Sequence, residues 1–158
     1  MRRIMMLFLA VFVLAGMVWA QDPSLGKWKL NLAKSKVPPN ETANTKEAVI
    51  EMRALDANTY ESISTTIQKD GKTEVTKWTV PISGGIQKYQ QGGPEKGISI
   101  VAAKIDPYHI VNVYLQDGKQ VFLMQMNISP DGKTFTGSAK VTDPQGKPFE
   151  YLVVYDKQ

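Results

Sequence analysis

Apolar residues alternate with polar ones in short runs along most of the chain, the pattern of strands with one buried face. The first run is the clearest, since Trp28, Leu30 and Leu32 occupy every second position. No stretch after residue 20 has a convincing helical period. We predict strands, in chain order, at residues 26–32, 47–55, 59–68, 73–82, 86–91, 97–105, 108–116, 119–128, 134–141 and 148–156.

Turn residues separate these strands about every ten positions, the spacing of an all-β sandwich or barrel. Asp-Gly, which supplies the positive φ that tight hairpins need, occurs at 70–71, 117–118 and 131–132. The segment at 33–46 contains two prolines and no apolar period, so we expect a long loop there. The pattern predicts an all-β fold, an antiparallel up-and-down barrel of about eight to ten strands.

Hairpin loops decide which residues face the interior, because a slip of one residue moves an apolar set to the opposite face. A two-residue turn at 117–118 places Val113 opposite Phe122 and His109 opposite Met126. The predicted inner faces of the four C-terminal strands are Val111, Val113 and Leu115; Phe122, Met124, Met126 and Ile128; Phe135 and Val141; and Phe149, Tyr151, Val153 and Tyr155, with Gly137 and Ala139 as small residues among them.

Two further loops set the remaining registers. A four-residue loop at 130–133 places Ile128 opposite Phe135, and the hydrophobic pattern favours it over a type I turn with a bulge, which would slip the register by one. The hairpin at 70–71 pairs Ile63 with Trp78, beside several polar residues. We therefore expect an interior that is apolar on one side and wetter on the other.

Residues 1–20 have the features of a secretory signal peptide. Two arginines precede an almost unbroken apolar run at 5–15, and Val18 and Ala20 fit the small-residue rule for cleavage. The run is too short to span a bilayer comfortably, and no basic stop-transfer cluster supports the alternative of an uncleaved anchor. We expect cleavage after Ala20, one barrel domain at 21–158, and a secreted or periplasmic location.

Charge and composition remove several classes of function. The signal carries two of the 19 basic residues and none of the 15 acidic ones, so the mature chain has a net charge of about +2. This weak charge gives no reason to expect a nucleic-acid partner. The chain has no cysteine, which excludes disulfides, thiol catalysis and zinc–thiolate sites. Met17 stands where a lipoprotein signal has its cysteine, so we expect no stable membrane anchor.

Aromatic and methionine side chains on the predicted inner face are the types that line apolar ligand pockets. A barrel of about eight strands is at the size where such residues either line a cavity or simply fill the interior, and both alternatives stay open. The residues we expect a ligand to contact are Trp78, Val111, Val113, Phe122, Met124, Met126, Tyr151 and His109, and further aromatic candidates are Tyr89 and Tyr114.

His109 is the single histidine of the chain. Catalysis needs an imidazole oriented by a carboxylate, and Asp106 is close in sequence but at a turn. The register points His109 inward, where one imidazole is enough to hold a haem iron. We expect instead a histidine at a barrel end that bonds to backbone or water, and neither an enzyme nor a cofactor.

The carboxylates form no evident metal or acid–base set. Glu61 and Glu74 share one face of the predicted 70–71 hairpin, which would raise the pKa of one of them if they met. We expect them at separate heights, neutralised by Lys72 or Lys77.

Gly26-Lys27-Trp28 on the first strand, followed by hairpins, resembles the start of lipocalin and calycin barrels. The resemblance is closest to a group of small secreted bacterial lipocalin-like proteins, and it implies a calycin-like barrel without a particular activity. The motifs that carry it are Gly26-Lys27-Trp28-Lys29-Leu30-Asn31, Ala33-Lys34-Ser35-Lys36, Ser129-Pro130-Asp131-Gly132-Lys133-Thr134 and Val154-Tyr155-Asp156-Lys157.

In lipocalins the tryptophan plugs the closed end of the barrel, and an arginine from the last strand covers it. The only arginine after residue 20 is Arg53. The resemblance therefore implies that a lysine, such as Lys140 or Lys157, takes that place.

We expect a non-enzymatic protein that binds a small apolar or amphiphilic ligand. The alternative is an interaction protein with a solid core, which docks a partner or a second copy through apolar residues on its outer face. A void of a few hundred cubic ångströms favours the ligand, and a filled interior favours the partner. The outer residues, which the loop at 33–46 would otherwise cover, are Val121, Leu123, Leu152 and Val154.

Overall fold

The structure is a computed structural model that describes residues 22–38, 42–142 and 146–158. The expected signal peptide at 1–20 lies outside these residues. No helix among the described residues is long and apolar enough to cross a membrane. The strands are β1 (Gly26–Leu30), β2 (Thr45–Asp56), β3 (Thr59–Gln68), β4 (Thr73–Pro81), β5 (Gly85–Ile86), β6 (Lys88–Gln91), β7 (Ile98–Asp106), β8 (His109–Gln116), β9 (Lys119–Ile128), β10 (Thr134–Thr142) and β11 (Pro148–Lys157).

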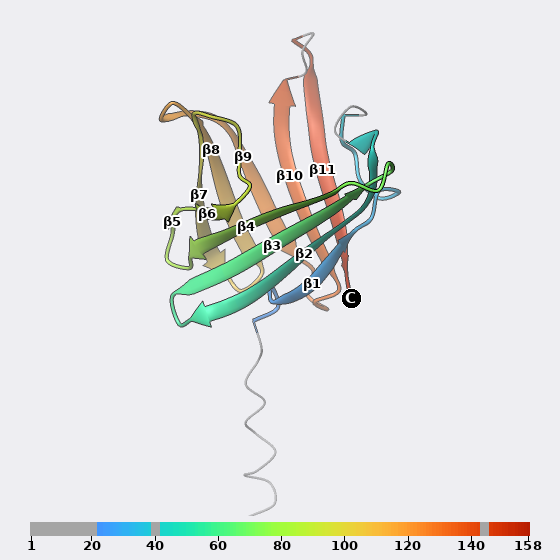
Figure 1. Ribbon diagram of the computed structural model, residues 1–158. Helices are drawn as coiled ribbons and strands as arrows, with labels where there is room; N and C mark the ends of the chain where they lie inside the picture. Colours follow the sequence, from blue (N-terminus) through green and yellow to red (C-terminus); the bar gives the residue numbers. More distant parts are fainter. Residues whose placement is uncertain (1–21, 39–41, 143–145) are drawn as a thin grey trace, which may run out of the picture.

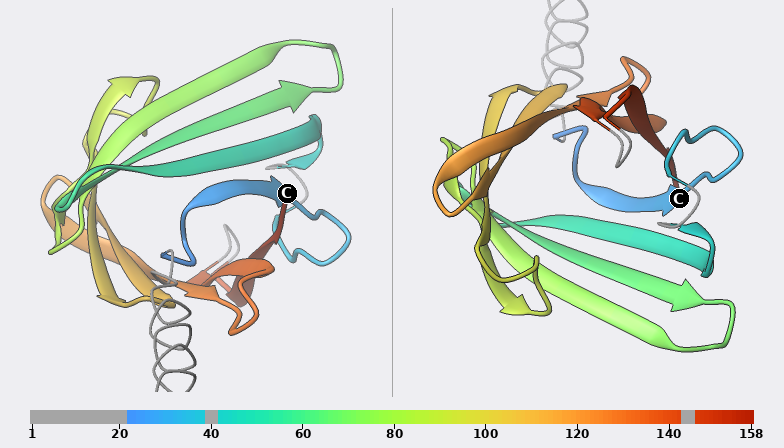
Figure 2. Two further views of the ribbon diagram at one scale, coloured as in Figure 1. Left: turned by 90° about the horizontal axis from the view of Figure 1, so that it is seen from below. Right: turned by 90° about the horizontal axis from the view of Figure 1, so that it is seen from above.

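All of these strands belong to one antiparallel sheet, in the order β5-β7-β8-β9-β10-β11-β1-β2-β3-β4-β6. The sheet curls until its two edges meet, and β1 lies between the two curved halves (Figures 1 and 2). Where the two edges face each other, they leave little unpaired backbone for other chains to join. The predicted all-β antiparallel barrel is confirmed.

The barrel closes through one short segment that pairs with both edges. We predicted a single strand at 86–91, but the chain divides it: β5 pairs with β7, and β6 pairs with β4. The crossing occurs at Gln87, whose N–H still donates to the Ile100 carbonyl at 2.8 Å. Gly84 precedes the segment with φ of +102°, a conformation that glycine adopts at little cost.

Trp28 is the centre of the hydrophobic core. It is fully buried, its indole N–H donates to the Ser24 carbonyl at 2.9 Å, and its ring centroid lies 5.4 Å from that of Phe135. The Lys157 ammonium lies 4.6 Å from the centroid of the ring and donates to the carbonyls of Pro23 and Leu25. A lysine from the last strand therefore covers the tryptophan, as the resemblance implied. The buried apolar cluster consists of Trp28, Met52, Met124, Met126, Ile128, Phe135 and Ala139.

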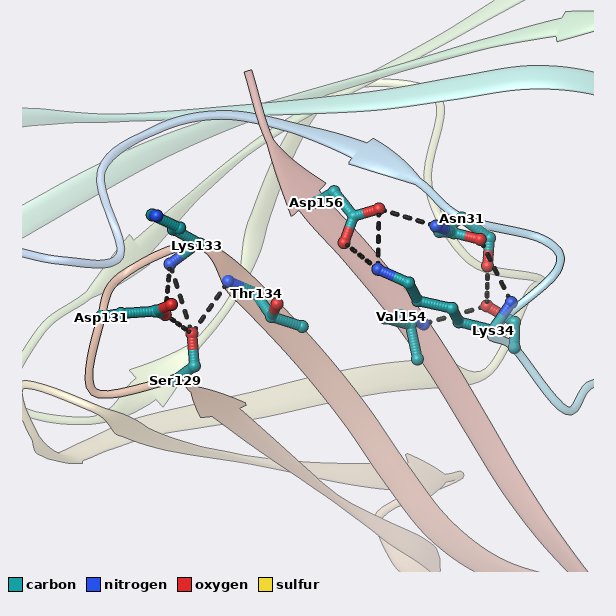
Figure 3. Close-up of polar contacts among 9 residues, drawn as sticks. Asn31, Lys34, Ser129, Asp131, Lys133, Thr134, Val154 and Asp156 are labelled. Atoms are coloured by element: carbon teal, nitrogen blue, oxygen red, sulfur yellow. Dashed lines mark hydrogen bonds and ion pairs between the residues drawn. The ribbon is translucent and has the colours of Figure 1, made fainter.

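The motifs that carried the resemblance lie in two neighbouring clusters of polar contacts (Figure 3), linked by the pairing of Thr134 with Asp156. Asp156 accepts hydrogen bonds from the Asn31 amide at 2.6 Å and from the Lys34 ammonium at 2.9 Å. The Ser35 hydroxyl accepts the Val154 N–H at 3.0 Å, and Lys36 forms a β-bridge with Leu152. These contacts fasten the chain after β1 onto β11, so the motifs serve the fold.

The loop between β9 and β10 has the four residues that we predicted. The Ser129 hydroxyl accepts the backbone N–H groups of Lys133 and Thr134 and donates to Asp131, which fixes the loop (Figure 3). Phe135 therefore lies opposite Ile128, as predicted. The predicted pairing of β10 with β11 is also confirmed along its length.

The hairpin of β3 and β4 differs from the prediction by one residue. Its loop has three residues, 69–71, closed by a hydrogen bond from the Gln68 N–H to the Lys72 carbonyl at 2.8 Å, with Gly71 at a φ of +89°. Ser62, and not Ile63, therefore lies opposite Trp78. A type I turn followed by a glycine bulge explains the extra residue.

The hairpin of β8 and β9 departs from the prediction in a second way. Its two-residue turn is present, with Gln116 opposite Lys119, but Val121 is an extra residue on β9 that forms a bulge. Beyond the bulge every partner shifts by one, so that Asn112 lies opposite Met124. Ile110, Asn112 and Tyr114 consequently face the interior, and the residues predicted there, Val111, Val113, Leu115 and His109, face outward.

Candidate ligand-binding cavity

The barrel interior contains a cavity of about 90 Å³. This space exceeds that needed by one water molecule, but it is smaller than the roughly 300–1,000 Å³ of pockets that hold drug-sized ligands. The described residues around this cavity therefore do not fill the interior completely, and the space that they enclose is small. The lining residues are Ile50, Met52, Tyr60, Ser62, Trp78, Val80, Gln87, Ala102, Ile110, Asn112, Met126 and Phe135.

Three polar side chains enter this mostly apolar lining. Ser62 and Gln87 are buried, and the Gln87 side-chain oxygen accepts the Tyr89 hydroxyl at 2.9 Å. The amide oxygen of Asn112 is also buried, but it has no hydrogen-bond partner among the described residues. An unsatisfied buried acceptor costs about 1–3 kcal/mol of stability, so this oxygen is the feature of the cavity that most needs a partner.

The position of Asn112 results from the bulge at Val121. Without that extra residue, β8 would turn its aliphatic face inward, with Val111, Val113 and Leu115, and Asn112 would reach solvent. The fold instead buries the face of β8 that carries Asn112, although the opposite face offers three aliphatic residues. Such departures from the hydrophobic pattern concentrate at functional sites.

The structure divides the predicted ligand-contacting residues into three groups. Trp78 and Met126 line the cavity. Met124, Phe122 and Tyr151 belong to the core or pack against it, outside the cavity lining. The Phe122 ring stacks on Tyr114 with centroids 4.0 Å apart.

The third group, Val111, Val113 and His109, lies on the outer face of β8, so the prediction of their inward position is wrong. His109 is exposed, and its Nδ1 lies 2.7 Å from the Asp106 carboxylate. The Tyr108 N–H and the His109 ring both lower the pKa of Asp106. The imidazole is thus paired with a carboxylate at a turn and does not point to the interior, where a haem would lie.

Sequence reasoning missed the cavity residues of β3 and β8 because a loop and a bulge shift the registers of these two strands. A three-residue loop brings Tyr60 and Ser62 inward beside Trp78, and the bulge brings in Asn112. The available signal was the lone polar residue inside the apolar run at 110–115. Phe135 was predicted on the inner face but not as a ligand contact, and the cavity residues not predicted are Ile50, Met52, Tyr60, Ser62, Val80, Gln87, Ala102, Ile110 and Asn112.

Tyr60 connects the cavity with a polar cluster that includes residues of the segment before β1 in the chain. Its hydroxyl donates to the Asp22 carboxylate, which also accepts the ammonium of Lys104. The Ser24 hydroxyl and N–H bind the other carboxylate oxygen, at 2.6 and 3.0 Å. Burial opposes the ionisation of Asp22, but the hydrogen bonds from Lys104 and Ser24 outweigh it and lower its pKa. A carboxylate, an ammonium and a phenol thus meet beside the cavity.

The two glutamates considered for a shared site do not meet. Glu61 lies on the outer face and is 4% exposed, because the side chains of Arg53 and Lys77 cover it. The hydrogen bond from Lys77 is the main cause of its lowered pKa. Glu74 pairs with Lys72 at 2.9 Å, so both lysines act as expected. The described residues contain no group of three or more side chains arranged to hold a metal ion.

The outer apolar residues behave as two pairs. Val154 is buried and Leu152 half-buried beside the chain at Lys36, whereas Val121 and Leu123 are 53% and 37% exposed. The pairing of β9 with β10 ends at Gln125 and Ser138, and beyond it the two strands separate (Figure 1). A surface cleft of about 580 Å³ lies at this place. The cleft is lined by Gln120, Val121, Phe122, Leu123, Gln125, Ser138, Ala139, Lys140 and Glu150.

Comparisons with known proteins agree with this architecture. No protein-family model matches the sequence, and no curated protein matches it. A crystal structure of a mutant of the fluorescent protein UnaG is similar, with a TM-score of 0.60 and 11% identity over 87% of this chain and 97% of that one. The wild-type UnaG structure gives a TM-score of 0.58 and 13% identity over 85% and 97%. At this identity the likeness establishes the fold alone, a calycin-like barrel.

Proposed function

We propose that the protein binds a small, mostly apolar molecule inside the barrel and performs no chemistry on it. The observation that carries this proposal is the Asn112 amide oxygen, buried in an apolar cavity without a partner among the described residues. Ligand sites combine an apolar lining with a few convergent polar groups in this way. The similarity to the fluorescent protein UnaG supports the barrel as a scaffold.

The ligand should offer a hydrogen-bond donor to Asn112 and an apolar body to Trp78 and Met126. The cavity of about 90 Å³ suits a single ring or a short chain. Larger ligands require side chains to move. Met52 and Met126 are the flexible members of the lining that allow such movement.

Phenol and toluene test the proposal, because they carry similar rings and only phenol has an O–H donor. Calorimetric titration of the protein should show phenol binding about tenfold more tightly than toluene, the effect of one hydrogen bond. Asn112→Leu should remove the preference for phenol. Ala102→Leu, which adds volume at the cavity wall, should weaken the binding of both rings.

Val113→Leu is the matched control, because it also introduces a leucine on β8, next to Asn112 but on the outer face. It should alter the affinity for neither phenol nor toluene. The proposal is abandoned if the wild type binds neither ring, or if Ala102→Leu binds both as well as the wild type does.

A second candidate function is association through the outer face at β9 and β10. The exposed Val121 and Leu123 beside the cleft favour it. Sedimentation equilibrium would show self-association that Val121→Lys and Leu123→Lys abolish. A strictly monomeric wild type at high concentration would argue against a second copy as the partner.

We also propose that the protein acts in the periplasm or outside the cell. The signal-like residues 1–20 support this location. We therefore propose that the protein is a small, secreted binding barrel of bacterial origin.

A further inference from the structure

Lys104 and Tyr60 form a pair of donors aimed at one point. Lys104 projects from β7 and Tyr60 from β3, and the ammonium lies 3.0 Å from the Tyr60 hydroxyl. Both donate to one oxygen of Asp22. The side chains of Lys104 and Asp22 are only 13% and 20% exposed, so this cluster is largely withdrawn from water.

The two donors come from the barrel wall, but the acceptor does not. Asp22 belongs to the short segment before β1, which crosses the interior side of the sheet (Figure 2). In the mature chain that we predict, Asp22 is the second residue. Residues near a chain terminus can be displaced without moving a strand of the sheet. The wall therefore holds a donor pair on two strands, and a carboxylate from the segment before β1 fills it.

Tyr60 also lines the apolar cavity, so the donor pair and the cavity are contiguous. An ammonium with a phenol hydroxyl is a strong acceptor site for a carboxylate, since charge-assisted hydrogen bonds are about twice as strong as neutral ones. A ligand that joins an apolar body to a carboxylate would satisfy both regions at once.

We infer that Lys104 and Tyr60 are the head-group site for an apolar monocarboxylate, and that Asp22 occupies this site until such a ligand displaces it. The inference rests on the proposed function, because the body of the ligand lies in the same cavity. It adds the chemical class of the ligand and an internal competitor for its head group.

Hexanoate and hexanol test the inference, because they share a chain length and differ in the head group. In calorimetric titrations, Asp22→Asn should tighten hexanoate binding by about tenfold or more, the ratio that one additional charge-assisted hydrogen bond corresponds to. Hexanol affinity should not change. Adding Lys104→Met to Asp22→Asn should abolish the gain.

Asp156→Asn is the matched control, because Asp156 also pairs with a lysine, Lys34, but on the outside of the barrel. It should leave both affinities unchanged. If Asp22→Asn fails to fold, the inference can still be tested by nuclear magnetic resonance of the wild type. Saturating hexanoate should shift the amide resonance of Ser24, which donates to Asp22, and hexanol should not.

Two results would overturn the inference: a folded Asp22→Asn that binds hexanoate no better than the wild type, or hexanoate binding that leaves the Ser24 resonance in place. If phenol and hexanol bind while either result holds, only the head-group site fails. If phenol, hexanol and hexanoate all fail to bind the wild type, the proposed function fails together with it.

Discussion

Asn112 is a polar side chain at a position where an aliphatic one would stabilise the barrel. Replacing it with leucine removes an unsatisfied buried acceptor and keeps a similar volume. We expect Asn112→Leu to raise the free energy of unfolding by about 1–2 kcal/mol, measured by urea denaturation. Gln125→Leu, on the exposed side of β9, should change it by less than about 0.5 kcal/mol. A strongly destabilised Asn112→Leu would show that the amide makes an essential structural contact.

The packing of Trp28 contributes a large share of the stability of the barrel. Trp28→Ala removes a fully buried ring from between Phe135 and Lys157. We expect a loss of about 3–5 kcal/mol in the free energy of unfolding, as for other large-to-small changes in cores. Urea denaturation followed by circular dichroism measures it. Unfolding at the wild-type urea concentration would contradict the central place given to this ring.

Asp22 should make stability depend on acidity. Its folded-state pKa is lowered from 3.8, so its contribution is present above the unfolded value and is lost as the pH falls through the folded one. Between about pH 5 and 2, the wild type should lose more stability than Asp22→Asn does. Urea denaturation at several pH values tests this. Other carboxylates titrate alike in both proteins, so parallel curves would mean that the Asp22 contacts contribute nothing.

At the level of elements, the three Asp-Gly-Lys sequences form three different hairpins. The loop at 69–71 has three residues, the turn at 117–118 has two, and the loop at 130–133 has four. Asp-Gly marks the place of a turn, because it tolerates positive φ, but it does not fix how many residues the loop contains. Contacts outside the turn, such as those of Ser129, decide the length.

This explains which registers the sequence could predict. One face of β10 has large residues together with the small Gly137 and Ala139, and this pattern allows only one reasonable register with each neighbouring strand. Both predicted registers are confirmed. β8 is apolar on both faces, so its pattern could not detect the bulge at Val121. The barrel was therefore predictable. Of the predicted ligand contacts, only Trp78 and Met126 line the cavity, and Asn112 could not be predicted because its inward position depends on that bulge.

Gly137 gives β10 its close contact with the strands on both sides. A Cβ there would lie 2.8 Å from the Met126 sulfur and 2.8 Å from a Val153 methyl group. Gly137→Ala should therefore destabilise the barrel by about 1–3 kcal/mol, although the same change usually favours a strand. Calorimetric melting would show it beside Ser138→Ala, which should be nearly neutral. A more stable Gly137→Ala would mean that both neighbours yield easily.

At the scale of the whole molecule, the expected leader has a direct test. Val18 and Ala20 fit the rule for signal-peptide cleavage, so the exported protein should begin at Gln21. Intact-mass measurement of protein from the periplasm or medium gives the mature terminus. A mass that retains residues 1–20 would refute the cleavage. It would also mean that Asp22 is not the second residue of the mature chain.

The pairing of β1 with β11 has a consequence for biosynthesis. About 125 residues separate Leu30 from its partner Tyr155, whereas most other strands pair with a close neighbour in the chain. Hairpins form in microseconds, but ribosomes add only about 5–20 residues per second. The strand of Trp28 emerges first and then waits for several seconds, with its indole uncovered, until Lys157 is made. During that interval the nascent chain presents a substrate for chaperones, and a protein truncated before β11 would remain one.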